Sequence, residues 1–220
     1  MEFLGCGSLR IMNKEQLFET SEFVIDLLKR IDVIHRSGHF IYTSGTHGDT
    51  YINKDAIYQY PKETIEIANL FAKRYQDFDI DVVIGPALGG IILAQWTANL
   101  LTELKNKTIR AAFTEKDHKG NQVLKRGYDQ LVKGRKVLIV EDIVNTGKSI
   151  GQVVQCVKNA GGDVIAASGI VNRSPDKINS ETFQVPFSAL CEISMEIYNP
   201  EECPLCESGI PINTNLGHGR

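Results

Sequence analysis

The sequence predicts an α/β protein: a doubly wound, mainly parallel sheet preceded by a small helix and hairpin. Several segments are uninterrupted apolar runs, as in strands that are covered on both faces of a sheet. These runs alternate with segments whose apolar residues recur every three or four positions, as in helices that pack on a sheet. The predicted strands are 82–84, 109–113, 137–140 and 164–171, and the helices between them are 91–101 and 149–160.

The composition is that of an ordinary globular protein. The 220 residues are 42% hydrophobic and 23% charged, with a formal net charge of -3. This balance excludes a basic surface for nucleic acid, so an anionic ligand must be held by local geometry. No apolar run approaches the roughly 18 residues of a membrane-spanning helix. Five unevenly spaced cysteines do not make a disulfide scaffold, which favours a cytoplasmic protein.

The N-terminal part has its own pattern. Residues 13–34 predict an amphipathic helix, segments 40–43 and 50–53 predict the two strands of a hairpin, and 61–75 predict a second helix that begins with a proline. No repeat or low-complexity linker divides the chain. We therefore expect an unstructured extension (1–12), an N-terminal helix and β-hairpin hood (13–60), the α/β core (61–198) and a C-terminal tail (199–220).

The most informative segment is 137–149, which we call the acid motif. An apolar strand ends in Glu141 and Asp142, a short loop with Thr and Gly follows, and a helix begins at Ser149. At the carboxyl end of a parallel strand, the loop N–H groups suit a phosphate and the carboxylates suit a sugar diol. A P-loop is disfavoured because Asp142 stands where that motif needs glycine. The alternative, that the two acids only solvate a strand end, stays open.

Three other segments can bind ligands or can be purely structural. Residues 85–90 follow a strand and open a helix, so they predict either an anion-binding nest or a close helix packing. The polar interval 114–128 predicts either a cation-bearing lid or a charged surface loop. Arg173 ends a strand, where it can pair with a carboxylate or simply be solvated.

The acid motif resembles the phosphoribosyl pyrophosphate (PRPP) motif of type I phosphoribosyltransferases. The similarity extends over nearly the whole chain, and it is greatest to orotate phosphoribosyltransferases of the bacterial and archaeal branch whose tail reads Cys-Pro-Leu-Cys, as in 203–206. The segments that carry it, besides the acid motif, are 44–45, 51–55, 85–90, 172–173 and 202–206.

The resemblance implies transfer of ribose 5-phosphate from PRPP to N1 of orotate in pyrimidine synthesis, with Mg²⁺ on the pyrophosphate and a lid loop shared across a homodimer. It implies catalytic roles for Lys116, Glu141 and Asp142. The implied PRPP-binding residues are Glu141, Asp142, Ile143, Val144, Asn145, Thr146, Gly147, Lys148 and Ser149. The implied pyrophosphate loop is Pro86, Ala87, Leu88, Gly89 and Gly90, the implied orotate-binding residues are Asn145, Arg173 and Lys54, and the lid adds His118 and Lys119.

Four departures from that family leave other functions open. Gly89 stands where many members have Lys, Glu115 replaces the Arg of an Arg-Lys pair, Thr43 stands where some have Lys, and Asn145 replaces Thr. The alternatives are a phosphoribosyltransferase for a purine base, which would not need Arg173, and a non-catalytic sensor of PRPP or nucleotides on the same fold.

The tail contains an isolated Cys-x-x-Cys. Cys203 and Cys206 have zinc-knuckle spacing, but no second pair completes four ligands. Cys191, His218 or a partner subunit could contribute further ligands. We therefore favour a reduced structural pair over a zinc site.

Overall fold

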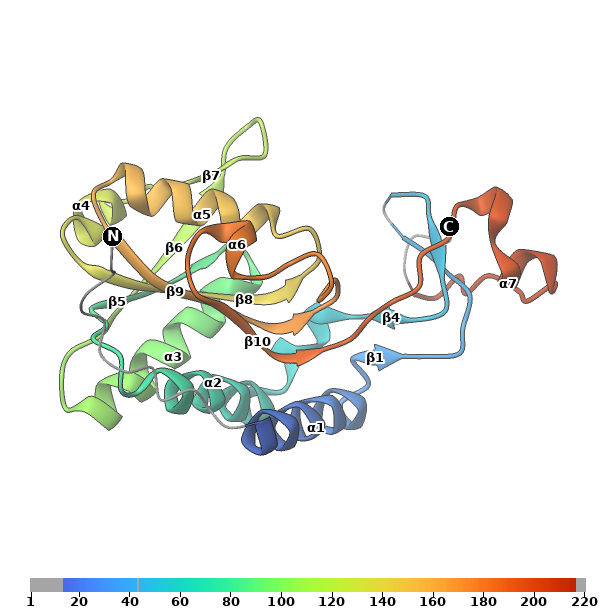
Figure 1. Ribbon diagram of the computed structural model, residues 1–220, viewed down its shortest axis with the longest axis horizontal. Coiled ribbons are helices and arrows are strands. Elements are labelled where there is room, and N and C mark those ends of the chain that lie inside the picture. Colours follow the sequence, from blue (N-terminus) through green and yellow to red (C-terminus); the bar gives the residue numbers. More distant parts are fainter. Residues whose placement is uncertain (1–13, 43, 217–220) are drawn as a thin grey trace, which may run out of the picture.

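The computed structural model describes residues 14–42 and 44–216, and a six-stranded sheet lies at its centre (Figure 1). The strand order is β10-β9-β8-β5-β6-β7, and every neighbouring pair is parallel except β6 and β7. The predicted α/β class with a mainly parallel sheet is confirmed. The strands are β5 (Val82–Pro86), β6 (Arg110–Lys116), β7 (Gln122–Val123), β8 (Lys136–Val144), β9 (Asp163–Asn172) and β10 (Phe187–Glu192).

Helices cover both faces of the sheet, as Figure 1 shows. Alternate residues of β8 enter two separate cores, because successive side chains of a strand point to opposite faces. Leu138 and Val140 pack in one core with α1, α2 and α3, whereas Val137 and Ile139 pack in the other with α4, α5 and α6. The helices are α1 (Lys14–Arg30), α2 (Pro61–Tyr75), α3 (Gly89–Lys105), α4 (Tyr128–Val132), α5 (Lys148–Asn159) and α6 (Ser180–Phe183).

The first helix ends earlier than predicted. Asp32 has a left-handed φ of 56°, and the Val33 N–H donates to the Leu28 carbonyl across this turn, which is the pattern of a Schellman cap. The prediction of helix up to residue 34 is therefore wrong. The apolar residues 33 and 34 continue the buried pattern after the helix has stopped, and Ile34 begins a strand.

The predicted hairpin is wrong in its pairing, because Phe40–Ile41 and Tyr51–Ile52 do not pair with each other. Strand β2 (Phe40–Ile41) pairs with β3 (His47–Gly48), while β4 (Tyr51–Ile52) pairs with β1 (Ile34–His35). The four short strands form one irregular antiparallel ribbon, residues 34–52, which we call the hood ribbon. A 3-10 helix, η1 (Lys54–Gln59), leads from this ribbon into α2.

The C-terminal tail returns to the hood ribbon (Figure 1). His47 and Tyr198 exchange two backbone hydrogen bonds of 2.9 Å, and the Asn213 N–H donates to the His39 carbonyl. The tail contains η2 (Pro200–Glu202) and α7 (Pro204–Glu207). The expected extension 1–12, Thr43 and His218 lie outside the described residues. Among the described helices, none is long and apolar enough to cross a bilayer.

Candidate active site

The order of the strands places the acid motif at a switch point of the sheet. From β5 the chain moves to β6 on one side and later returns to β8 on the other. Ligands of open α/β sheets bind beyond the carboxyl ends of the strands at such a point, because the two loops there diverge and leave a crevice. The loop 85–90 and the acid motif are the two segments that leave β5 and β8 at this edge.

Glu141 and Asp142 lie inside β8 and point to opposite faces of the sheet. The strand continues to Val144, four residues beyond its predicted end. Both acids are buried, with 7% and 1% of their surface exposed. Asp142 shares the face of Leu138 and Val140, where Tyr58 donates a hydrogen bond of 3.3 Å to Oδ2. Glu141 instead faces the loop that precedes α5.

The electrostatics of this pair follow from its burial. Burial first, and the neighbouring Asp142 second, raise the pKa of Glu141 well above its ordinary value of 4.5. Lys54 reaches the pair from η1, with Nζ 3.5 Å from Asp142 Oδ2. Partial burial works to lower the pKa of Lys54, but the charges of Asp142 and Glu141 outweigh it and raise that pKa. One cation therefore already sits against the Asp142 carboxylate.

A cavity of about 100 Å³ lies between the end of β8 and the start of α5. Gly147 forms the N-cap of α5 with a φ of 71°, a conformation that strains other residues. A Cβ at Gly147 would also lie 2.8 Å from the Phe183 ring. The N-terminus of this twelve-residue helix suits an anion such as phosphate. The cavity is lined by Glu141 and residues 143–150, which include the predicted phosphate-binding residues.

The loop 85–90 lies against the acid pair because Gly89 has no side chain. A Cβ at Gly89 would stand 2.0 Å from Asp142 Oδ2 and 2.6 Å from the Tyr58 hydroxyl. Helix α3 begins at this glycine, and the Ala87–Leu88 peptide is cis. The Ala87 N–H donates to the Thr114 carbonyl, so this donor is already used. Leu88 is 80% exposed and faces outward.

Arg173 lies under the hood ribbon. Its backbone N–H donates to the Val144 carbonyl, which fixes it next to the end of β8. The guanidinium stands 5.4 Å from the centre of the Tyr42 ring, and Nε donates to the Met195 sulfur. Burial lowers the pKa of Arg173, although Tyr42 and Tyr51 oppose this effect. No carboxylate within the described ranges forms a salt bridge with Arg173. It is thus a half-buried cation suited to an anionic group.

The predicted lid is a β-hairpin that projects from the body (Figure 1). Strands β6 and β7 pair as Glu115 with Val123 and Lys116 with Gln122, so a regular ladder replaces part of the expected loop. His118 and Lys119 are exposed at its tip, and Lys116 is exposed on β6. Glu115 binds Arg126 at 2.6 Å and Lys125 at 3.6 Å. Glu115, which departs from the family pattern, therefore links the base of the hairpin to the two cations that follow it.

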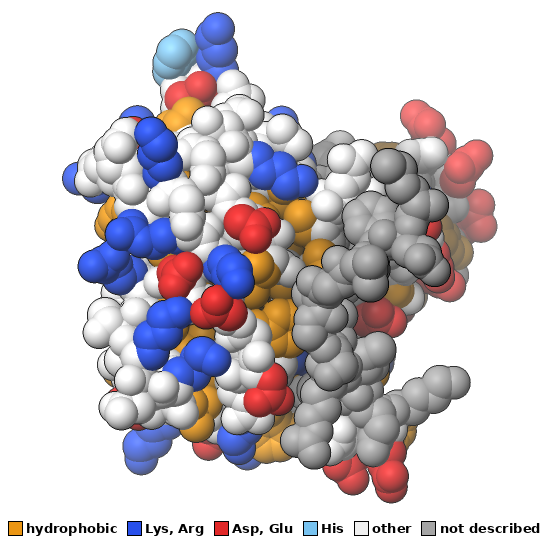
Figure 2. All heavy atoms as spheres, turned by 60° about the vertical axis from the view of Figure 1, so that its left-hand side comes forward, with side chains coloured by type: hydrophobic (Ala, Val, Ile, Leu, Met, Phe, Trp, Pro, Cys, Tyr) orange, Lys and Arg blue, Asp and Glu red, His pale blue; other side chains and the backbone are white. Residues whose placement is uncertain are grey.

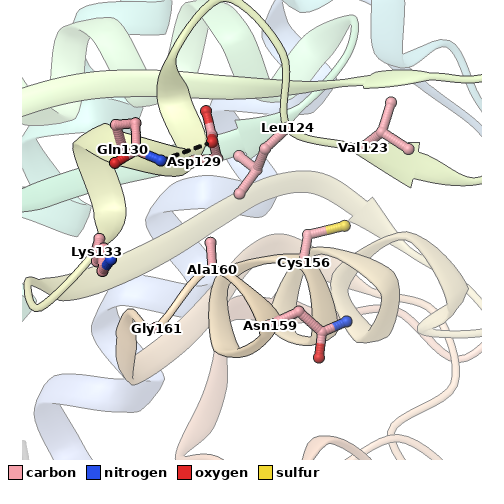
Figure 3. A pocket seen from close by; sticks show the side chains of 9 residues that line it. All are labelled: Val123, Leu124, Asp129, Gln130, Lys133, Cys156, Asn159, Ala160 and Gly161. Carbon is pink, nitrogen blue, oxygen red and sulfur yellow. Dashed lines mark hydrogen bonds between the residues drawn. The ribbon is translucent and has the colours of Figure 1, made fainter.

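A larger hollow lies away from the acid motif. It has a volume of about 650 Å³ and lies between β7, α4 and the last turn of α5, where the side chains of Leu124 and Cys156 face it (Figure 3). The end of α5 leads into the amino end of β9, so this hollow is on the wrong edge of the sheet for a ligand site of this fold.

The face at the amino ends of the strands shows no single-sign patch. Figure 2 shows acidic and basic side chains interleaved there. Lys107 pairs with Asp79 and Asp81, and Lys136 also pairs with Asp79, at 2.9 to 3.0 Å. These are exposed pairs of the kind that solvate a surface.

Sequence reasoning missed two aromatic residues of the site, Tyr58 and Tyr42. Tyr58 lies 84 positions from its partner Asp142, and Tyr42 lies 131 positions from Arg173, so no local spacing links them. The one available signal was the position of Tyr42 in a predicted strand of the hairpin; Tyr58 follows that hairpin, in η1, and had no such signal.

The fold and the site define an α/β protein with a candidate anion-binding cavity at the carboxyl edge of its sheet. Residues 53–184 match the phosphoribosyl transferase domain family. The chain is 40% identical over 191 residues to the orotate phosphoribosyltransferase of Caldanaerobacter subterraneus subsp. tengcongensis, which covers 87% of this chain and 94% of that protein. The chain belongs to the phosphoribosyltransferase family, and the expected resemblance is confirmed.

Solved structures share the fold. The orotate phosphoribosyltransferase of Francisella tularensis superposes with a TM-score of 0.59 at 19% identity, over 77% of this chain and 85% of that one. The adenine phosphoribosyltransferase of Trypanosoma brucei reaches 0.57 at 18% identity, over 81% and 84%. Enzymes for different bases therefore share this architecture, and the fold alone does not identify the base.

Proposed function

We propose that this chain is an orotate phosphoribosyltransferase of pyrimidine synthesis, which converts PRPP and orotate to orotidine 5′-monophosphate and pyrophosphate. One observation carries the proposal: the acid pair and phosphate-sized cavity of β8 lie beside Arg173, a cation with no carboxylate partner among the described residues. Binding of PRPP requires the acid pair and the cavity. Orotate differs from uracil and the purines by a carboxylate, which an arginine binds well. Relatives at 40% identity carry this name.

The site residues fit the reaction as positioning groups. Loop N–H groups of residues 145–149 hold the 5-phosphate, and Glu141 and Asp142 accept hydrogen bonds from the ribose hydroxyls. The bond from C1 of the ribose to the pyrophosphate oxygen breaks, and pyrophosphate leaves with the bonding electrons. N1 of orotate gives up its proton to solvent and forms the new bond to C1. The positive charge that develops on the ribose is stabilised by the two nearby carboxylates.

The acid pair also fits Mg²⁺, because carboxylate oxygens are the ligands it prefers. Tyr58 and Lys54 already contact one Asp142 oxygen, so most ligands would come from the pyrophosphate of PRPP. When bound, Mg²⁺ disperses the negative charge of the leaving group.

We further propose that the enzyme is a cytoplasmic homodimer whose hairpin 115–123 covers the neighbouring subunit's site. Lys116, His118 and Lys119 are exposed on this hairpin and would bring positive charge to the pyrophosphate. Free thiols at Cys156, Cys191, Cys203 and Cys206 suit a reducing compartment.

A panel of bases tests the proposal. Purified protein with Mg²⁺ and PRPP is given orotate, uracil, adenine or hypoxanthine, and nucleotide formation is followed by ultraviolet absorbance and chromatography. Turnover of orotate alone supports the proposal. Turnover of a purine and not of orotate would refute the choice of base, whereas PRPP binding without any turnover would favour the non-catalytic sensor.

A further inference from the structure

Four metal-binding side chains meet where the C-terminal tail crosses the hood ribbon. His39 and His47 come from the ribbon, and Cys203 and Cys206 come from the tail around α7. One ligand atom from each residue lies within 4.8 Å of all the others. Cys191, which was expected as a further ligand of the Cys-x-x-Cys, takes no part, because it lies in β10 with its thiol on the Ile170 carbonyl. His218 lies outside the described residues.

We propose that His39, His47, Cys203 and Cys206 bind a Zn²⁺ ion that fastens the tail to the hood ribbon. Two nitrogen and two sulfur ligands with tetrahedral geometry are the usual set for structural zinc, whereas Mg²⁺ and Ca²⁺ require oxygen. Binding displaces the two thiol protons to solvent, so that both sulfurs coordinate as thiolates. This site is separate from the acid motif and does not depend on the proposed activity.

The distances fit a tetrahedral ion. Bonds of about 2.0 Å to nitrogen and 2.3 Å to sulfur place neighbouring nitrogen and sulfur ligands about 3.5 Å apart. The sulfur of Cys206 lies 3.3 Å from His47 Nδ1 and 3.7 Å from His39 Nε2, and the sulfur of Cys203 also lies 3.7 Å from that nitrogen. The two imidazole nitrogens, now 2.9 Å apart, would separate by roughly 0.4 Å around the ion.

The ribbon and the tail hold the ligands in position. Ile41 pairs with His47, and His39 precedes Ile41 by two residues, so the two histidines are diagonal neighbours on one face. The other ring nitrogen of His39, Nδ1, lies 2.7 Å from the Ile210 carbonyl. Because a carbonyl only accepts, Nδ1 carries the proton and the Nε2 lone pair faces the cluster. Such a second contact is typical of metal-bound histidine.

This part of the molecule lies outside the two hydrophobic cores. Neither hydrophobic core includes a residue from 36–50 or 199–213. The strands of the ribbon are two residues long, and such short strands are not stable alone in water. Yet His39, His47 and Cys203 are almost completely buried. A metal ion commonly replaces a hydrophobic core in segments of this size.

Metal content tests the site directly. Full-length protein is purified in the presence of a reductant, and zinc is measured by elemental mass spectrometry and by native mass spectrometry. We expect about one zinc per chain in the parent and a loss of about tenfold or more in Cys206→Ser. Cys206 is exposed, so this substitution leaves the packing unchanged. Cys156→Ser is the matched control, because it removes a thiol on α5 and should keep the metal.

A second measurement detects the site even if zinc is lost during purification. Zinc is removed with a chelator and Co²⁺ is added, and tetrahedral cobalt with thiolate ligands gives an intense visible absorption and a sulfur-to-cobalt charge-transfer band. The parent and Cys156→Ser should show both, and Cys206→Ser and His47→Gln should not. Folded parent protein that holds no zinc and gives no such spectrum would overturn the proposal. So would a spectrum that survives both substitutions, or a Cys203–Cys206 disulfide that persists under the reductant.

Discussion

The ammonium group of Lys54 lies 3.5 Å from the Asp142 carboxylate, although 88 positions separate the two residues. Helix η1 carries Lys54 from the hood ribbon to the face of β8 on which Asp142 lies. The space beside the Asp142 carboxylate stays open because Gly89 has no side chain. Many phosphoribosyltransferases have a lysine in the loop that contains Gly89. In this chain Lys54, from another element, brings a cation to Asp142.

Replacing Lys54 with alanine should lower kcat/KM for PRPP by about tenfold to a hundredfold, since each 1.4 kcal/mol lost in the transition state is tenfold in rate. The Asp142 carboxylate, which we propose binds the ribose hydroxyls, then loses its positive neighbour, so this prediction assigns Lys54 to PRPP and not to orotate as the resemblance implies. Steady-state kinetics at a fixed orotate concentration measure this change in kcat/KM for PRPP. Lys107→Ala is the matched control, because Lys107 also pairs with an aspartate, but at the amino edge of the sheet. Equal kinetics for both variants would contradict this role.

Gly89→Ala should abolish use of PRPP. The new methyl group would stand 2.0 Å from Asp142 Oδ2, so either the loop or the carboxylate must move. Gly151→Ala is the control: it lies inside α5, and a Cβ there meets nothing within 4 Å. That substitution should keep the activity and stabilise the protein by about 0.5 to 1 kcal/mol, because alanine favours a helix over glycine. Titration with PRPP and thermal unfolding measure both effects, and full activity of Gly89→Ala would refute the close approach.

Arg173 should govern orotate and not PRPP. Removing one partner of a half-buried charge pair typically costs 2 to 5 kcal/mol, so Arg173→Ala should raise the KM for orotate by about a hundredfold or more. The KM for PRPP should change little. Arg173→Lys should recover only part of the affinity, because lysine cannot form the bidentate pair. Asp142→Asn should show the reverse pattern and impair PRPP use. Identical effects of Arg173→Ala on both substrates would place Arg173 outside the base pocket.

Glu141 should make the ligand-free protein less stable as the pH rises. Its pKa is raised by burial, so the folded protein holds this proton more tightly than the unfolded chain does. The contribution of Glu141 to stability is therefore complete below about pH 4.5 and is lost as the pH rises through the folded-state pKa. Glu141→Gln should accordingly have a higher Tm than the parent near neutral pH, and the gain should shrink toward pH 4.5, while activity is lost.

Glu115→Gln provides a control of opposite sign. The hydrogen bond from Arg126 lowers the pKa of Glu115, so its ionised form is favoured in the folded protein. The parent should be the more stable of the two near neutral pH, and the difference should vanish as the pH falls through that lowered pKa. The effect should be small, because the Glu115 side chain is only partly buried and its cationic partners are exposed at the surface. A Tm gain for Glu141→Gln that does not depend on pH would exclude ionisation as its cause.

The core could be predicted from the sequence because its strands and helices have strong periodic patterns. Helix α2 has the predicted bounds, and β8 and β9 were both recognised from continuous apolar runs. Strand β10 was missed because its six residues mix polar and apolar side chains, and it gains its position by pairing with β9 at the edge of the sheet. The strand pairing predicted for the hood ribbon was wrong, because its strands are too short to show an alternation of polar and apolar residues.

The site could be predicted only where its residues lie in one continuous segment. Glu141, Asp142 and the loop to Ser149 are such a segment, and the structure gathers them around one cavity. The contacts of Lys54 with Asp142 and of His39 with Cys203 join residues 88 and 164 positions apart. A single histidine or lysine in a sequence fits many environments, so these partners emerge only from the tertiary fold.

Removal of the proposed zinc should loosen the tail and the hood ribbon and leave the core folded. The amides of His47 and Tyr198 donate hydrogen bonds to each other's carbonyls, and the Asn213 amide donates to the His39 carbonyl. All three hydrogen bonds join the tail to the hood ribbon, where the metal would hold the two segments together. After chelation, hydrogen–deuterium exchange at these segments should become faster, whereas β8 and β9 should stay protected.

The same treatment should raise the KM for orotate more than the KM for PRPP. Tyr42, which covers Arg173, follows β2 directly, and β2 lies between the two histidine ligands in sequence. A looser ribbon therefore weakens the pocket for the base, while the acid motif in β8 remains in place. Adding Zn²⁺ back should restore both the slow exchange and the KM, and Cys206→Ser should mimic the chelated parent with or without zinc. Uniform exchange across core and tail after chelation would instead indicate that the ion stabilises the whole domain.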